Sequence, residues 1–167
     1  MGEFLEHRYL VALGSNMRHG RHGDPRKVVA AALEAIAGEG HRVEAISPLI
    51  ESAPLGPSKR RYANAVAIVY SSAPPRAMLT GMKAIEDAFG RRSWRRWGAR
   101  VIDIDLVLWG GGTYRSAELS IPHPLFRERT FVLGPATRIA ADWRDSDTGL
   151  TVRQLHRRLT RPGAVPR

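Results

Sequence analysis

The order of the apolar segments along the chain constrains its fold more than any other feature of the sequence. Two stretches carry apolar residues at helical spacing, one beginning at Pro25 after an Asp24 cap and the other ending before Gly90. Short apolar runs with strand character lie at residues 9–13, 42–49, 62–70 and 101–109. The predicted order of elements is therefore β-α-β-β-α-β.

This order is the split βαβ, or ferredoxin-like, pattern, and it predicts an α/β (α+β) sandwich on one mainly antiparallel sheet. After the last strand the sequence predicts a loop at residues 113–124, short helical pieces at 126–139 and a final helix at 152–159. These segments would be extra C-terminal elements of the sandwich. A chain of 167 residues fits one domain, so we expect residues 1–167 to form a single domain.

The composition excludes several kinds of chemistry. The chain has no cysteine, so disulfides, a thiolate nucleophile and cysteine-ligated zinc are all ruled out. No apolar run approaches membrane length, and we expect a soluble cytoplasmic protein without a membrane partner. Lys and Arg outnumber Asp and Glu by 26 to 16, a formal charge of +10. That excess suits a nucleic acid, an anionic lipid or a phosphorylated small molecule, and an arginine-rich solvated surface accounts for it equally well.

Two aspartates lie in the predicted strand at residues 101–109, which has the strongest strand pattern of the chain. Alternate side chains of a strand share a face, so Asp103 and Asp105 should project from one face of the sheet. The apolar side chains between and after them should project from the other face, and these are Ile102, Ile104, Leu106 and Leu108. Two neighbouring carboxylates repel each other without a cation, and carboxylates together with substrate phosphates are ligands that suit Mg²⁺. The alternative is one aspartate paired with an arginine and the other solvated.

The segment before this strand is rich in arginine. Five arginines occur in the thirteen residues ahead of Asp103, and the part from Gly90 to Gly98 also holds two tryptophans. Guanidinium groups match phosphate oxygens two at a time, so a basic segment beside an acidic strand favours a metal–phosphate site. We expect residues 90–98 to close over bound phosphates as a lid. An ordinary solvated loop is the alternative.

The run from Arg96 to Val107, RWGARVIDIDLV, closely resembles the signature of the 6-hydroxymethyl-7,8-dihydropterin pyrophosphokinase family. Further blocks follow the family's order and near-family spacing over roughly residues 8–140. These blocks are Gly14-Ser15-Asn16, Pro54-Leu55-Gly56-Pro57, Tyr62-x-Asn64, Ile85-Glu86, Gly90-Arg91, Ile121-Pro122-His123 and Arg129-x-Phe131. The resemblance implies the ferredoxin-like fold that the order of elements also predicts.

The resemblance also implies a role for individual residues. Asp103 and Asp105 would bind two Mg²⁺ ions that bridge the phosphates of ATP, the co-substrate. Arg91 and Arg100 would be the catalytic arginines that stabilise charge on the reacting phosphates. The expected nucleotide-binding residues are Lys83, Glu86, Trp97, Ile102, His123 and Arg129. The expected pterin-binding residues are Ser52, Leu55, Tyr62, Asn64 and Phe131, with the pterin ring stacked between the two aromatic side chains.

The implied reaction is transfer of pyrophosphate from ATP to 6-hydroxymethyl-7,8-dihydropterin in folate biosynthesis, with release of AMP. We expect a monomer that binds these small molecules and no nucleic acid. Two other functions stay open from the sequence. One is a paralogue that binds pterin or nucleotide without turnover, and the other is an RNA-binding ferredoxin-like module, although no RNP-like aromatic motif is found.

Overall fold

The computed structural model describes residues 5–16, 20–52, 61–90 and 101–163. The elements, in chain order, are β1 (His7–Ser15), α1 (Pro25–Gly38), β2 (Arg42–Ile46), β3 (Ile50–Ser52), β4 (Tyr62–Ser71), α2 (Pro75–Ala88), β5 (Asp103–Trp109), β6 (Tyr114–Arg115), β7 (Ser120–Ile121), the 3₁₀ turn η1 (Phe126–Glu128), α3 (Thr130–Ile139) and α4 (Val152–Thr160).

The main sheet has the strand order β2-β4-β1-β5, and β3 also pairs with β4. Every pairing in it is antiparallel. The strand β1 is central, with β4 hydrogen-bonded on one side and β5 on the other. The predicted α+β fold with one mainly antiparallel sheet is therefore confirmed. None of the helices in the described ranges combines the length and the apolar character needed to cross a bilayer.

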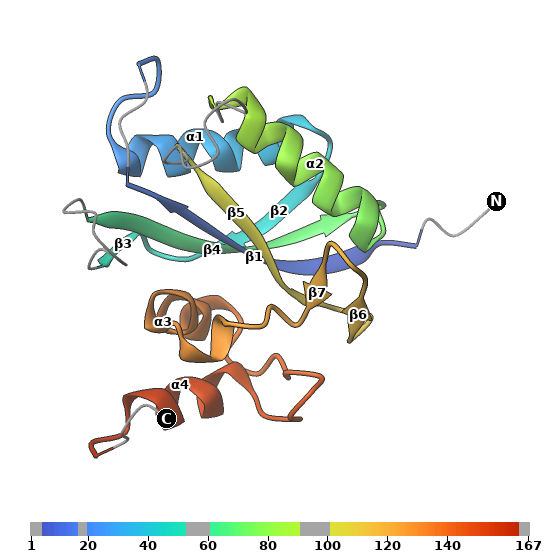
Figure 1. Cartoon of the computed structure of the whole chain (residues 1–167), viewed down its shortest axis with the longest axis vertical. Coiled ribbons are helices and arrows are strands. Elements are labelled where there is room, and N and C mark those ends of the chain that lie inside the picture. Colours follow the sequence, from blue (N-terminus) through green and yellow to red (C-terminus); the bar gives the residue numbers. More distant parts are fainter. Residues whose placement is uncertain (1–4, 17–19, 53–60, 91–100, 164–167) are drawn as a thin grey trace.

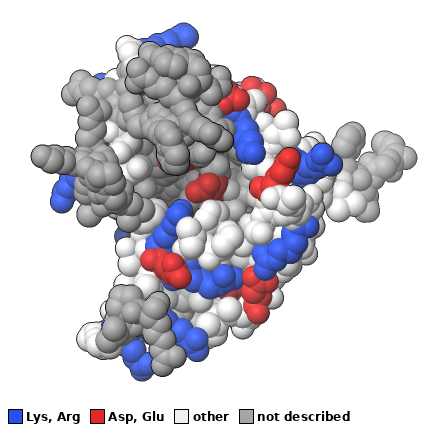
Figure 2. All heavy atoms as spheres, in the orientation of Figure 1, with Lys and Arg blue, Asp and Glu red and all other residues white. Residues whose placement is uncertain are grey.

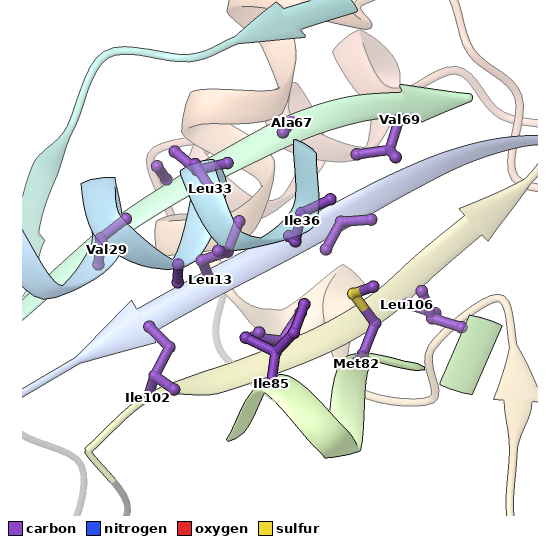
Figure 3. Close-up of a cluster of buried hydrophobic side chains, with 14 of the residues drawn as sticks. Leu13, Val29, Leu33, Ile36, Ala67, Val69, Met82, Ile85, Ile102 and Leu106 are labelled. Atoms are coloured by element: carbon purple, nitrogen blue, oxygen red, sulfur yellow. The ribbon is translucent and has the colours of Figure 1, made fainter. Parts of the chain in front are cut away.

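One face of the sheet is covered by α1 and α2, and their side chains interlock with those of the strands (Figures 1 and 3). Asp24 caps α1, because its side chain accepts a hydrogen bond from the backbone N–H of Lys27 at 3.2 Å, and Pro25 follows at the first turn. The buried residues of α1 have the helical spacing predicted for this stretch, and they are Val28, Val29, Ala32, Leu33 and Ile36. The helical spacing in the sequence thus identified the face that packs on the sheet.

The opposite face of the sheet is also covered, by α3, and α4 packs beneath α3 (Figure 1). Leu10, Val66 and Ile68 of the sheet belong to a second apolar cluster, together with Leu133 of α3 and Leu155 of α4. The predicted C-terminal elements therefore form a third layer below the sheet. Thr151 starts α4 with a capping box, in which its side chain and that of Gln154 each bond to the other's backbone N–H.

The predicted strand at residues 42–49 is wrong at its end, since β2 stops at Ile46 and the next strand, β3, starts only at Ile50. Pro48 has no backbone N–H to continue a ladder, and the chain leaves β4 there. Ser47 maintains the contact instead, because its N–H donates to Val66 O and its Oγ accepts from Val66 N, both at 2.9 Å. The predicted loop at 113–124 also differs, because it contains the β6–β7 hairpin.

The predicted face of Leu108 is wrong. The pairing of β5 with β1 shifts by one residue, since Leu10 pairs with Leu108 but Val11 pairs with Leu106. Val107 is the additional residue of this β-bulge, and it changes the phase of the alternation. Leu106 consequently packs with α1 and α2, as predicted, whereas Leu108 packs in the cluster with α3 and α4.

Truncating Ile36 should strongly destabilise the fold. Its side chain is 0% exposed in the cluster beneath α1, so Ile36→Ala is expected to lower the free energy of unfolding by about 2–5 kcal/mol. The matched control is Ile46→Ala, because Ile46 on β2 is 51% exposed and should cost less than about 1 kcal/mol. Urea denaturation of both variants measures the difference, and equal losses would contradict this assignment of the core.

Candidate active site

Three neighbouring strands bring polar side chains together near the end of β1. In the sheet register Gly14 pairs with Asn64 of β4 on one side and with Asp103 of β5 on the other. Two residues earlier, Ala12 pairs with Asp105. Directly paired residues project from the same face of a sheet, so the amide and both carboxylates lie on the α3 side. The predicted common face of the two aspartates is thus produced by the strand pairing.

The small residues of β1 make room for these polar groups. A Cβ atom on Gly14 would lie 3.0 Å from Asn64 Oδ1, which is closer than side chains normally approach. Asn64 is buried, and its Nδ2 donates a 2.6 Å hydrogen bond to Ser52 Oγ on β3. Glycine at this position therefore allows the Asn64 amide to lie across the backbone of the central strand.

A pocket of about 130 Å³ opens above these strands. We call it the first pocket. Its lining includes the predicted pterin residues that the structure describes, namely Ser52, Tyr62, Asn64 and Phe131. Asp103, Asp105 and Arg129 also line it. An apolar and aromatic wall thus meets two carboxylates and a guanidinium group within one small cavity.

A second cavity, of about 400 Å³, lies on the α2 side of Asp105. We call it the groove. Lys83 and Glu86 of α2 line it together with His123, and the β6–β7 hairpin supplies residues 116–120 as the facing wall. Asp105 lines both the groove and the first pocket, so the two cavities adjoin at this carboxylate.

Glu86, a predicted nucleotide contact, also has a structural role in the fold. The residue is buried, and its Oε2 accepts a 3.2 Å hydrogen bond from the backbone N–H of Ile104. The bond ties α2 to β5 and satisfies a buried backbone donor, which would otherwise be costly. Glu86 is therefore a structural link as well as part of the wall of the groove.

His123 and Arg129 approach the second aspartate from the loop that precedes α3. His123 Nε2 lies 3.9 Å and Arg129 Nη1 3.8 Å from Asp105 Oδ2. His123 Nδ1 accepts a hydrogen bond from Leu125 N at 3.1 Å, so the proton of the neutral ring is on Nε2, the nitrogen nearer Asp105. This arrangement leaves an N–H donor and a guanidinium group beside a half-exposed carboxylate.

Burial is the main influence on the titrating groups here. It lowers the pKa of His123, against the opposing effect of the Asp105 carboxylate, and the positive charge of Arg129 lowers it further. Burial also raises the pKa of Tyr62, and the nearby carboxylate of Asp103 acts in the same direction. The neutral form of His123 is therefore favoured near neutral pH, and Tyr62 keeps its proton.

Several predicted site residues lie outside the described residues, namely Leu55, Arg91, Trp97 and Arg100. The same holds for the predicted lid at residues 90–98, except for Gly90. Ile102 is 1% exposed and packs among core residues, so only its backbone is available to a ligand.

The sequence did not predict that three residues of β1 line the first pocket, namely Ala12, Leu13 and Gly14. The predicted strand ended at residue 13, although β1 continues to Ser15, and a glycine inside a strand is the signal for such a close approach.

The carboxylates fit a magnesium site that depends on the substrate. In the described ranges, no three His, Asp or Glu side chains gather so that they could hold a metal ion by themselves. Mg²⁺ is commonly bound by one or two carboxylates, with substrate phosphates and water as the other ligands. Asp103 and Asp105, on one face of β5 and lining the same pocket, match that donor set.

The fold and the site define a ferredoxin-like α+β enzyme in which an acidic strand lies between an aromatic pocket and a polar groove. Comparison with known protein families identifies the family to which this enzyme belongs. Residues 10–141 match the model of the 7,8-dihydro-6-hydroxymethylpterin-pyrophosphokinase (HPPK) family, and the chain belongs to that family.

Curated relatives agree with this assignment. The chain is 37% identical over 149 residues to the 2-amino-4-hydroxy-6-hydroxymethyldihydropteridine pyrophosphokinase of Synechocystis sp., covering 89% of this chain and 74% of the relative. It is 38% identical over 142 residues to the enzyme of that name from Pseudomonas aeruginosa, covering 84% and 85%. The one from Haemophilus influenzae is 37% identical over 135 residues, covering 79% and 81%.

The charges around His123 can be tested directly. Asp105→Asn should lower the pKa of His123 further, since it removes the carboxylate that favours the protonated ring, and Arg129→Gln should raise it. NMR titration of the His123 ring protons measures both changes. Asp142→Asn is the control, because that exposed carboxylate pairs with Arg153 and should leave the titration unchanged. Shifts of the same sign in the first two variants would contradict the arrangement described above.

Proposed function

We propose that this protein transfers the pyrophosphoryl group of ATP to the hydroxymethyl oxygen of 6-hydroxymethyl-7,8-dihydropterin in folate biosynthesis and releases AMP. The observation that most directly supports this proposal is that Asp105 lines both cavities, the aromatic first pocket and the groove. Two substrates bound in adjoining cavities would meet at the acidic face of β5. Membership in the HPPK family and the names of the curated relatives support the same reaction.

The pterin would bind in the first pocket. Tyr62 and Phe131 supply aromatic surfaces for a flat ring, and Asn64 supplies an amide that can both donate and accept hydrogen bonds at its edge. Ser52 orients that amide through its 2.6 Å hydrogen bond. Leu55 is proposed to complete this pocket.

ATP would bind in the groove with its phosphates toward Asp105. Lys83 lines the groove, and the neutral His123 can donate from Nε2 to a phosphate oxygen. Arg129 would bind a second oxygen, as a guanidinium group suits phosphate. Glu86, Trp97 and Ile102 are proposed nucleotide contacts, the last through its backbone, and Arg91 and Arg100 are proposed to stabilise charge on the reacting phosphates.

Asp103 and Asp105 would hold two Mg²⁺ ions together with the phosphates of ATP. When bound, Mg²⁺ would neutralise phosphate charge and help to align the attacking and leaving oxygens. The contribution of the protein is then positioning and electrostatic stabilisation, because a loose phosphoryl-transfer transition state needs little covalent help. The carboxylates face one pocket from one strand, which keeps their spacing fixed.

We further propose that the chain acts as a single-domain monomer in the cytoplasm and does not bind nucleic acid. RNA-binding ferredoxin-like domains use an open sheet face, whereas here α3 covers the face opposite to α1 and α2, with α4 packed beneath it. Over the described residues in Figure 2, basic and acidic side chains are interspersed instead of forming one basic area. Both observations support a small-molecule function.

The reaction is tested by incubating the protein with ATP, Mg²⁺ and hydroxymethyl-dihydropterin and measuring AMP. Asp103→Ala and Asp105→Ala should each lower turnover by on the order of 10²-fold or more, with little change in melting temperature, because neither side chain belongs to the core. Asp142→Ala is the control, since that exposed carboxylate lies away from both cavities. Turnover above a few per cent in either active-site variant would refute the role of the acidic pair.

Gly14→Ala should weaken pterin binding more than ATP binding. The new Cβ would lie 3.0 Å from Asn64 Oδ1 and displace the amide that is proposed to bind the pterin edge. Gly38→Ala is the control, because nothing lies within 4 Å of a Cβ added at the end of α1. Calorimetric titration of each ligand measures the effect, and a loss confined to ATP would contradict the assignment of the first pocket.

A further inference from the structure

Asp145, in the turn between α3 and α4, is a fully buried carboxylate outside both cavities. Four donors satisfy its two oxygens. Arg127 Nε donates to Oδ2 at 2.5 Å and Arg127 Nη2 to Oδ1 at 2.8 Å, while Thr148 Oγ1 and Asp147 N donate at 2.8 and 3.0 Å. A buried ion pair is costly to form and still more costly to break, so this one restrains both partners.

The guanidinium partner of Asp145 lies in the turn that carries the phosphate-binding residues. Arg127 is the middle residue of η1, four residues after His123 and two before Arg129. A two-nitrogen contact fixes the orientation of a guanidinium group as well as its distance. It therefore also restrains η1, from which Arg129 reaches to 3.8 Å from Asp105.

A second branch reaches the opposite wall of the groove. Asp147 Oδ2 accepts from Arg127 Nη2 at 3.2 Å and from Arg115 Nη2 at 2.7 Å. Arg115 belongs to β6, and Thr113 beside it bonds to Ser146 at 2.7 Å. The loop at residues 145–147 is thus bonded both to η1 and to the hairpin whose residues line the groove.

We infer that Asp145 and Arg127 are positioning residues that hold Arg129 in place for the phosphates of the nucleotide. The inference rests on the proposed function for the identity of the ligand, and on the geometry alone for the restraint. Neither side chain lines the first pocket or the groove, so both act through η1.

The charges of this pair persist over the working pH range. Burial raises the pKa of Asp145, but hydrogen bonds from Arg127 and Thr148 outweigh it and hold the pKa below its ordinary value. The hydrogen bond to Asp145 is also the main cause of the raised pKa of Arg127. The restraint is therefore constant, not a pH-dependent switch.

A double-mutant cycle separates positioning from general stability. Asp145→Asn keeps the shape of the side chain and removes its charge, and we expect kcat/KM for ATP to fall about tenfold in the otherwise unchanged protein. In the Arg129→Ala background the same change should cost less than about twofold, because no guanidinium group is left to misplace. A purely structural role would give equal losses in both backgrounds and would overturn the inference.

The control variant is Asp142→Asn. It alters a carboxylate of the same loop region, which is 81% exposed and bonded to Arg153 of α4 at 2.6 Å, and it should leave kcat/KM unchanged in both backgrounds. If Asp145→Asn does not fold, Arg127→Lys takes its place, since it keeps the charge and loses the two-nitrogen contact. A smaller loss is expected there, again present only with Arg129 intact, and a loss that persists in Arg129→Ala overturns the inference.

The same cycle measured on binding of inorganic triphosphate with Mg²⁺, by calorimetry and without pterin, keeps the two proposals distinguishable. If the unaltered protein releases no AMP, the proposed function fails and the triphosphate cycle still tests the positioning. Non-additive losses in triphosphate affinity support the inference. Additive losses, or an Arg129→Ala variant that binds triphosphate normally, refute it.

Discussion

The antiparallel pairing of β1 with β4 on one side and β5 on the other is the interaction on which the rest of the structure depends. It places Gly14 between Asn64 and Asp103, and so brings residues far apart in sequence into one row. Glycine lets the Asn64 amide lie over the central strand, where a Cβ would be 3.0 Å from its oxygen. Backbone hydrogen bonds that stabilise the sheet therefore also fix the spacing of the polar groups.

The two faces of the sheet differ in function, because one forms most of the apolar core and the other borders the ligand cavities. α1 and α2 pack on one face along the predicted apolar stripes and form most of the core. α3 packs on the other face, and the residues that lead into it, His123 and Arg129, lie within 4 Å of the carboxylate of Asp105. A guanidinium group, a neutral imidazole and a carboxylate thus meet at the border between a packed layer and the ligand cavities.

The sequence predicted much of the fold because periodicity is a local property. The spacing in α1, the cap at Asp24 and the common face of Asp103 and Asp105 all follow from side-chain geometry within one element. Its failures have equally specific causes. The split after Ile46 comes from a proline and from a serine that bonds to Val66, and the wrong face of Leu108 comes from a one-residue bulge that only the pairing with β1 reveals.

Taken by itself, the sequence determined the order of the elements, the helix faces, the acidic strand and, through its resemblance to one family, the expected chemistry. Only the tertiary structure decided that Asp105 is shared by two cavities, that Glu86 is held by a backbone N–H of β5, and that Asp145 is buried against Arg127. These features depend on contacts between residues distant along the chain. Local spacing does not encode such contacts, because they exist only once the sheet and the helical layers on its two faces have assembled.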